Sequence, residues 1–427
     1  MGSELIYRIR AHPVIFIFLL AVFIRIVLVF VFPLPDQSGG DFPLYSRIAE
    51  SLVAQGDFGG EPQKTYGSPY ISPGFAFYLA FLYLLFGKSI IVLISASILL
   101  GGLIAVGVYF LAFCIFTDKK VAFIAGMTAA LWPTFLIQTF SFGNSLLLYT
   151  ALLLFSILFF IKAIFEKKII FAIFSGAILG FAALTEPIAF YIPLVFLIWT
   201  AALFLFRKTI SNFEFRLKFL ATIFSLFLIT FIAIIAPWGY RNTLVSNTEL
   251  NKIPVISKGE LQLLTPEYLG KLATPFFSRL DILVFGLEKM FIFPYNISSL
   301  DHDKVFSYKK VAMNFVSGAS VELSGRQTIV FMTKILFTLL YWILLGLGFW
   351  GMARYNSKYL NLLTILLLGY IVVASIGYGS LGDNNFENIA LLSSFFFVLL
   401  PFFIIFASKL LIEEKDRMYS CILNTKK

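Results

Sequence analysis

The sequence predicts an all-α protein that crosses a membrane about ten or eleven times. Of its 427 residues, 59% are hydrophobic and 13% are charged, whereas a soluble domain carries about 25% charged residues. The hydrophobic residues form long runs, many of them near the roughly 20 residues that a helix needs to cross the hydrocarbon layer. The basic residues lie mostly in the short stretches between these runs, as the positive-inside rule produces.

Eleven apolar runs are candidate spans. They cover residues 13–34, 71–87, 88–116, 121–140, 144–164, 169–185, 188–206, 219–238, 331–352, 359–379 and 389–410. The first run is too long for a signal-peptide core and lacks a small-residue cleavage site, so we expect it to remain as a membrane helix. Three regions follow: a transmembrane module over 1–238 with an outer loop at 35–73, an extracytoplasmic loop or small cap over 239–330, and carboxy-terminal transmembrane helices with a short cytoplasmic tail over 331–427.

The basic residues also predict an orientation, because the positive-inside rule places them in the cytoplasm. From Lys119 and Lys120 onward the spans alternate without conflict, which puts Glu186, Glu387 and the 239–330 loop outside. Before them, three spans separate Lys119 from Arg10, although an even number is required if both bases lie in the cytoplasm. Either one segment between 35 and 117 is re-entrant, or Lys119 and Lys120 face outward. The helix-breaking run at 70–74 favours the first alternative.

Several functional classes are disfavoured by the composition. The net charge of +10 does not indicate nucleic-acid binding, because the bases form no continuous basic face; membrane lipids are the expected surroundings. The two cysteines, Cys114 in an apolar run and Cys421 in the polar tail, predict no disulfide framework. With two histidines and no paired Cys/His spacing, a dedicated zinc site is not expected.

The outer loop at 35–73 is where we expect the chemistry, because it concentrates five acids and two bases at the mouth of an apolar bundle. Asp41 follows two glycines and can act as a general base on an acceptor hydroxyl or amine. Alternatively, it caps a helix that begins at Phe42 and Pro43; both roles are compatible. The segment 43–55 has helical apolar periodicity and predicts an amphipathic helix on the membrane surface. In the loop that follows, Lys64 and Tyr66 offer a cation and a hydroxyl to a phosphate.

Four ionisable residues outside this loop are further candidates. Arg25 lies within the first apolar run, where it either snorkels or reaches into the bundle, and an ionisable group at that depth is a functional candidate. Glu186 interrupts an apolar stretch and is either a site residue or a carboxylate at a helix hinge. Arg241 is either an ordinary membrane-edge base or a bidentate phosphate clamp. Glu387 lies in the last outer turn, where simple solvation is the alternative.

The order of these features resembles the GT-C superfamily of polytopic glycosyltransferases, in the branch that is related to protein O-mannosyltransferases and to the lipid A aminoarabinose transferase. The resemblance covers roughly residues 13–245. The matching positions are Arg25, then Asp41, Tyr45 and Ala49, the turn Gln55-Gly56-Asp57, the stretch from Ser72-Pro73-Gly74 to Phe86-Gly87, and finally Pro237, Trp238, Arg241 and Asn242.

This resemblance implies a GT-C-like fold and transfer of a sugar from a polyprenyl-phosphate-linked donor to a lipid, glycan or protein acceptor. The reaction is expected on the non-cytoplasmic face of a prokaryotic plasma membrane. By this resemblance Asp41 is the base that activates the acceptor. The residues expected to bind the donor phosphate are Arg241, Lys64, Tyr45 and Tyr66, with Arg25, Asn242, Glu186 and Glu387 in support.

Glu186 and the turn around Glu387 depart from the family pattern, because many relatives carry cations there. Either the donor lies differently, a divalent metal ion bridges an acid and the phosphate, or activity is lost. A transporter or flippase of a lipid-linked saccharide and an inactive relative are therefore the alternative functions. Against the transporter, the polar residues gather at the outer face rather than at mid-membrane, and no internal repeat is detectable.

Overall fold

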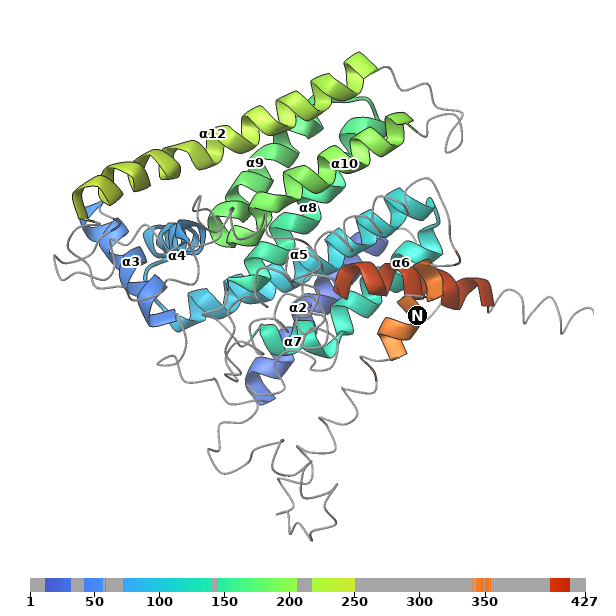
Figure 1. Cartoon of the computed structure of the whole chain (residues 1–427). Helices are drawn as coiled ribbons and strands as arrows, with labels where there is room; N and C mark the ends of the chain where they lie inside the picture. Colours follow the sequence, from blue (N-terminus) through green and yellow to red (C-terminus); the bar gives the residue numbers. More distant parts are fainter. Residues whose placement is uncertain are drawn as a thin grey trace, which may run out of the picture.

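The structure is a computed structural model whose regular elements, within the residues it describes, are all helices (Figure 1). It describes residues 12–31, 42–56, 58, 72–139, 145–205, 217–249, 340, 343–348, 350–352, 354 and 400–414. The helices are α2 (Pro13–Val31), α3 (Phe42–Gln55), α4 (Pro73–Phe86), α5 (Ile90–Phe116), α6 (Lys119–Leu131), α7 (Pro133–Gln138), α8 (Leu146–Phe165), α9 (Ile169–Thr185), the 3-10 helix η1 (Pro187–Tyr191), α10 (Ile192–Leu205) and α12 (Leu217–Glu249). The predicted all-α class is confirmed.

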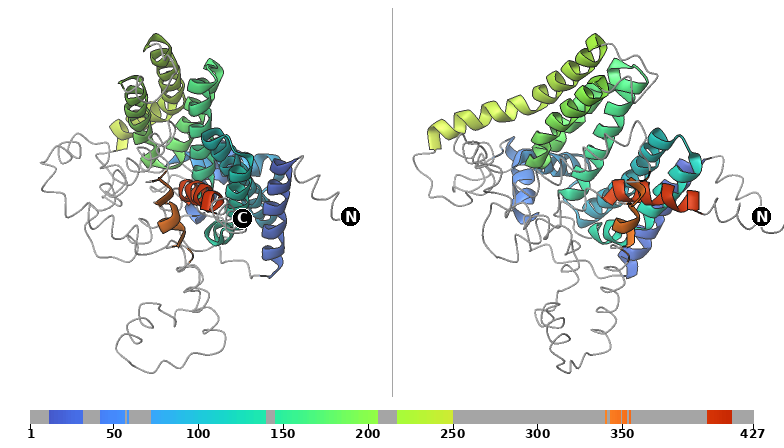
Figure 2. Two further views of the ribbon diagram at one scale, coloured as in Figure 1. Left: turned by 90° about the vertical axis from the view of Figure 1, so that its right-hand side faces the viewer. Right: turned by 45° about the vertical axis from the view of Figure 1, so that its right-hand side comes forward.

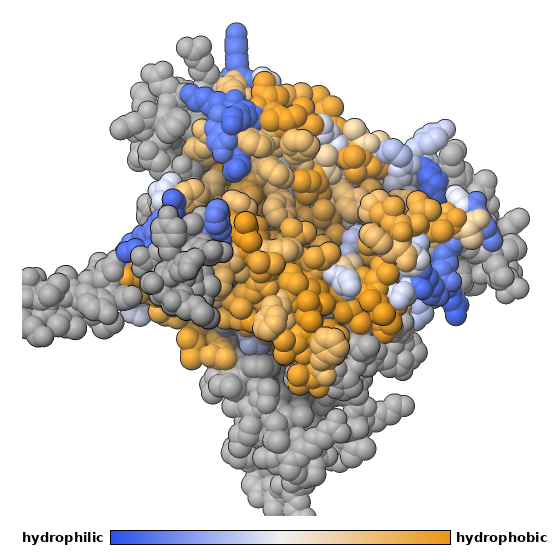
Figure 3. Space-filling view, turned by 180° about the vertical axis from the view of Figure 1, so that it is seen from behind, coloured by the Kyte–Doolittle hydropathy of each residue, from blue (hydrophilic) through white to orange (hydrophobic). Residues whose placement is uncertain are grey.

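Four helices in the described part of the chain are long and apolar enough to cross a membrane, namely α2, α5, α8 and α12. Helix α8 lies at the centre of the bundle, since 78% of its apolar window is buried, against 17% for α2 and 22% for α12. Apolar side chains cover a broad face of the molecule, with hydrophilic side chains towards its margins (Figure 3). The protein is therefore an integral, multi-pass membrane protein, and the full number of crossings depends on residues outside the described ranges.

Aromatic rings fill the centre of the bundle. Phe160 of α8 stacks on Phe196 of α10 with 4.2 Å between ring centroids, and Phe227 of α12 lies 5.1 Å from Phe160. Near the other end of the chain, residues 343–352 and 400–414 include two helical stretches that lie side by side (Figure 2). Phe406 of the second stretch packs edge-on against Phe116 at the end of α5. The carboxy-terminal helices are thus part of the same bundle.

Two predicted spans differ from the observed helices. The run at 121–140 is not one helix, because α6 ends at Leu131 and α7 starts at Pro133. Proline lacks the backbone N–H that a continuous helix needs and restricts the residue before it. The run at 219–238 continues as α12 to Glu249, over 33 residues. That length corresponds to about 50 Å, so α12 is longer than the hydrocarbon layer is thick.

The predicted span at 71–87 is helix α4, and both of its ends contact α3. Near the start of α4, the Phe75 ring meets the Tyr45 ring edge-on at 5.3 Å. Near its end, the Tyr83 hydroxyl lies 3.0 Å from Ser46 Oγ. A helix of 14 residues rises about 21 Å, which is less than the roughly 30 Å of hydrocarbon. The contacts with α3 and the short length of α4 agree with the re-entrant alternative, which stays a prediction.

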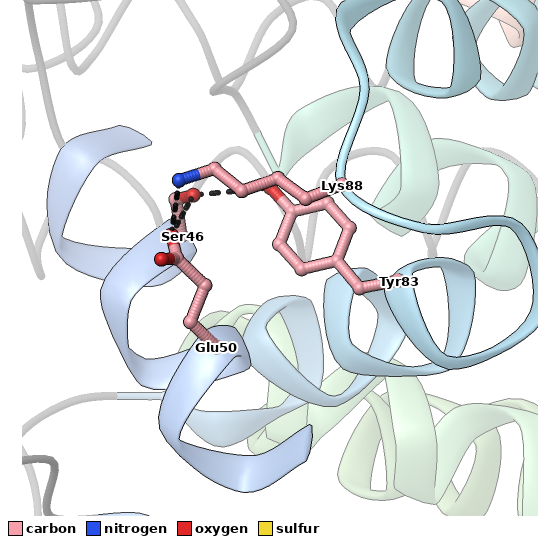
Figure 4. Close-up of polar contacts among 4 residues, drawn as sticks. All are labelled: Ser46, Glu50, Tyr83 and Lys88. Carbon is pink, nitrogen blue, oxygen red and sulfur yellow. Dashed lines mark hydrogen bonds and ion pairs between the residues drawn. The ribbon is translucent and has the colours of Figure 1, made fainter. Parts of the chain in front are cut away.

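A polar cluster also joins α3 to the end of α4 and the residue beyond it (Figure 4). Lys88, which follows α4, lies 2.6 Å from the Glu50 carboxylate of α3, and Ser46 Oγ donates to the same carboxylate at 3.1 Å. With α4 removed from the count, α2 and α5 are the two crossings between the amino-terminal bases and Lys119. That number is even, so a re-entrant α4 would remove the orientation conflict.

This arrangement predicts that Lys88 and Lys119 lie on opposite sides of the membrane. In a background with Cys114→Ser and Cys421→Ser, a membrane-impermeant maleimide added to right-side-out vesicles should label Lys88→Cys directly. The same reagent should label Lys119→Cys only after permeabilisation, because α5 separates the two positions. Labelling of Lys88→Cys only after permeabilisation would mean that α4 crosses the membrane.

Candidate functional site

One end of the bundle brings the first outer loop against the distal part of α12 (Figure 1). Three rings meet there, which we call the aromatic cluster: Phe58 from the loop, Phe77 from α4 and Trp238 from α12. The Phe58 and Trp238 rings lie 4.5 Å apart, and Phe77 lies 5.9 Å from Phe58 and 6.2 Å from Trp238. Segments that are far apart in the sequence therefore share one packed contact at the edge of the membrane-spanning helices.

Arg241 lies on the aromatic cluster. Its guanidinium carbon is 4.5 Å from the Trp238 ring centroid and 5.1 Å from the Phe58 ring centroid. Trp238 and Arg241 are three residues apart on α12 and so share one helix face. Arg241 Nη1 also donates to Asn242 Oδ1 at 3.1 Å. The predicted phosphate clamp is thus a guanidinium held against aromatic faces beside an amide.

Helix α3 brings a further predicted site residue to this end of the molecule. Tyr45 is half-buried and packs at the margin of the group formed by Ile48, Phe58 and Ala76. Phe42, the first residue of α3, is buried against α4 and α5. Asp41 immediately precedes Phe42 but lies outside the described residues, as do Lys64, Tyr66 and Glu387. The assignments of these four residues stay predictions.

Glu186 lies at the junction between α9 and η1, where the backbone is extended. It accepts a hydrogen bond from the hydroxyl of Ser145, at the start of α8. The amino-terminal end of a helix favours an anion. The start of α4 also reaches this junction, because a Cβ on Gly74 would overlap Thr185. The hinge interpretation of Glu186 therefore has a structural basis, and Gly74 explains the small residue in the Ser72-Pro73-Gly74 entry.

Arg25 is completely buried and reaches into the bundle. Its Nη1 donates to the carbonyls of Ala21 at 2.9 Å and Ala130 at 3.2 Å, and its Nε donates to Thr139 Oγ1 at 3.1 Å. Ala130 lies in the last turn of α6, where the carbonyls have no helical partner and a cation is favourable. Gly101 of α5 makes room, since a Cβ there would overlap the guanidinium. Arg25 thus stabilises the break between α6 and α7.

The described residues contain no group of three or more His, Cys, Asp or Glu side chains that could hold a metal ion. A bridging divalent ion therefore stays an open prediction that involves Glu186 or residues outside the described ranges. Sequence reasoning missed Phe58, Phe77 and Ser145. Only Phe58 had a usable signal, as a large aromatic residue placed between Gly56 and the pair Gly59-Gly60 in an otherwise polar loop.

The arrangement around Arg25 predicts a structural rather than a ligand-binding role. Arg25→Gln should lower the free energy of unfolding by about 1–3 kcal/mol, because buried carbonyls lose their donors. Affinity of the folded protein for polyprenyl phosphate should change by less than about threefold. Thermal unfolding in detergent and equilibrium binding below the transition measure the two effects. The exposed Lys120→Gln is the matched control, and a large loss of affinity in Arg25→Gln without loss of stability would contradict this role.

Comparisons with known proteins agree with this architecture. Residues 69–238 match the family model described as dolichyl-phosphate-mannose-protein mannosyltransferase. No curated protein matches the chain with significant sequence similarity. The oligosaccharyltransferase of Archaeoglobus fulgidus in its apo form superimposes with a TM-score of 0.55 at 16% identity, covering 96% of this chain and 51% of that one.

Two further solved structures are similar. The same archaeal enzyme, AglB, in complex with an inhibitory peptide and a dolichol-phosphate, gives a TM-score of 0.54 at 14% identity, covering 98% of this chain and 52% of that one. ArnT from Cupriavidus metallidurans bound to undecaprenyl phosphate gives a TM-score of 0.44 at 14% identity, covering 92% of this chain and 77% of that one. This TM-score is too low to establish a common fold. The present chain spans about half the length of the archaeal enzyme. The chain therefore has the membrane fold of the GT-C glycosyltransferases, and within residues 69–238 it carries the sequence pattern of their mannosyltransferase branch.

Proposed function

We propose that the protein is a membrane glycosyltransferase that moves a sugar from a polyprenyl-phosphate-linked donor to a lipid, glycan or protein acceptor. We place the reaction on the non-cytoplasmic face of a prokaryotic plasma membrane. One observation carries the proposal: Arg241 lies against Phe58, in the loop that follows α3, and α3 begins directly after Asp41. Helix α3 thus connects the residue assigned as the general base, before its start, with the loop that contacts the cation assigned to the phosphate.

The chemistry that this arrangement supports is a displacement at the anomeric carbon of the donor sugar. Asp41 accepts the proton of the acceptor hydroxyl or amine while the acceptor atom forms a bond to that carbon. The bond between the carbon and the phosphate oxygen breaks, and the polyprenyl phosphate leaves with the electron pair. Arg241 stabilises the negative charge that develops on the phosphate, and such a displacement inverts the configuration of the sugar.

The position of Arg241 suits a donor that stays in the bilayer. Tyr240, beside it, is 68% exposed, and tyrosine and tryptophan favour the interface between lipid and water. A lipid-linked phosphate lies at that depth. Lys64, Tyr45, Tyr66 and Asn242 are assigned to the same phosphate, whereas Glu186 and Glu387 border the site as acids. If a divalent ion bridges one of these acids to the phosphate, EDTA will abolish donor binding.

Asp41→Asn should reduce sugar transfer by about 10²- to 10⁴-fold, the usual contribution of a general base. Binding of polyprenyl phosphate should be retained, since the carboxylate acts on the acceptor. Transfer is measured with the purified protein and a polyprenyl-phosphate-linked sugar, with Asp36→Asn in the same loop as the matched control. Full activity of Asp41→Asn would contradict the assignment of Asp41 as the base. If the wild-type protein moves an intact lipid-linked saccharide across the membrane and transfers no sugar, the flippase alternative is favoured.

Arg241→Ala should weaken binding of polyprenyl phosphate by about 10- to 100-fold, because a hydrogen bond to a charged group contributes about 1.5–3 kcal/mol. Saturable binding to the detergent-solubilised protein measures the effect. Arg47→Ala, which removes an exposed arginine from α3, is the matched control and should bind normally. Equal binding by the wild type and Arg241→Ala would show that the donor phosphate lies elsewhere.

A further inference from the structure

Phe58 holds an unusual position for a loop residue. Helix α3 is followed by Gly56, which has a φ of +70° and donates its N–H to the Leu52 carbonyl at 3.1 Å. A positive φ after the last helical turn favours glycine and reverses the chain. Two residues later the chain returns to α3 and α4, where Phe58 is only 6% exposed and packs against Ile48 and Ala76. The end of α3 thus determines where this ring lies.

The ring of Phe58 also determines the surroundings of Arg241. Trp238 belongs to the same helix face as Arg241, so α12 alone can supply that contact. The contact with Phe58 comes from a different part of the chain and ties the guanidinium to the first outer loop. The two rings meet at an interplanar angle of 65°. Arg241 is therefore oriented by two differently inclined aromatic surfaces, one from its own helix and one from the loop.

Stacking has a specific consequence for phosphate binding. A cation–π contact draws the guanidinium against the ring without accepting from its N–H groups in the way that a phosphate oxygen does, so N–H groups in the guanidinium plane can still bind phosphate. An arginine side chain that is already held in one orientation loses less conformational freedom when it binds an anion. The aromatic contacts of Arg241 should therefore raise its affinity for phosphate without any contact between the rings and the phosphate.

We propose that Phe58 is a positioning residue for the donor site: its ring orients Arg241 towards the donor phosphate and couples that site to α3. This inference rests on the proposed function, in which Arg241 binds the phosphate of a polyprenyl-linked donor and Asp41 precedes α3.

The test uses the full chain in detergent and undecaprenyl phosphate as the probe. Phe58→Leu should raise the dissociation constant about 3- to 30-fold, the range expected for loss of a cation–π contact, and Phe58→Tyr should restore wild-type binding. Phe77→Leu, which removes another ring of the aromatic cluster, is the matched control and should change the constant by less than about twofold. In the transfer assay, Phe58→Leu should raise the donor KM and leave kcat unchanged.

A second comparison separates positioning from general packing. If Phe58 acts through Arg241, then Phe58→Leu should cause no further loss of binding in an Arg241→Ala background. The inference would be overturned if Phe58→Leu weakened binding equally in both backgrounds, or if Phe58→Leu and Phe77→Leu had equal effects. Either result would leave the assignment of Arg241 to the donor phosphate unchanged. If the wild type does not bind undecaprenyl phosphate, the proposed function and this inference both fall. If Phe58→Leu does not fold, failure of Phe58→Tyr to bind would equally contradict the inference.

Discussion

The packing of α3 against α4 is the interaction on which the candidate site depends. It holds residues near both ends of the 14-residue helix α4 against α3. The ion pair between Glu50 and Lys88 and the contact between Ser46 and Tyr83 hold the two helices together at one end. At the other end, Ile48, Phe58 and Ala76 pack together. Without this pair, Phe58 would have no fixed relation to α12.

Charged residues within apolar runs have different roles in this protein, although hydropathy treats them alike. Arg25 is buried and supplies hydrogen bonds to carbonyls that a broken helix leaves without partners. Glu186 lies at a helix junction and accepts a hydrogen bond from the hydroxyl of Ser145 at the start of α8. Arg241 rests on aromatic faces at the edge of the bundle. Only the last of these arrangements is proposed to bind a substrate, and all three avoid placing an unpaired charge in lipid.

The sequence was sufficient for the features that depend on local pattern. Long apolar runs identified α2, α5 and α8, the periodicity of residues 43–55 identified α3, and the order of motifs indicated the GT-C fold. Hydropathy could not predict how α4 packs, because its contacts with α3 join separate segments of the chain. The break at Trp132 had a local signal in Pro133 that was not used, whereas the packing of Phe58 on Arg241 was missed because it joins distant segments. Contacts between distant segments are not encoded in any local window.

Helix α12 continues beyond the aromatic cluster to Glu249. Seven residues beyond Asn242 correspond to about 10 Å of helix, so the end of α12 is joined to Arg241 by about two turns of one helix. The residue that follows Glu249 therefore keeps a fixed distance from the candidate site. Proteins built on this scaffold could differ after that point without a change in the position of Arg241.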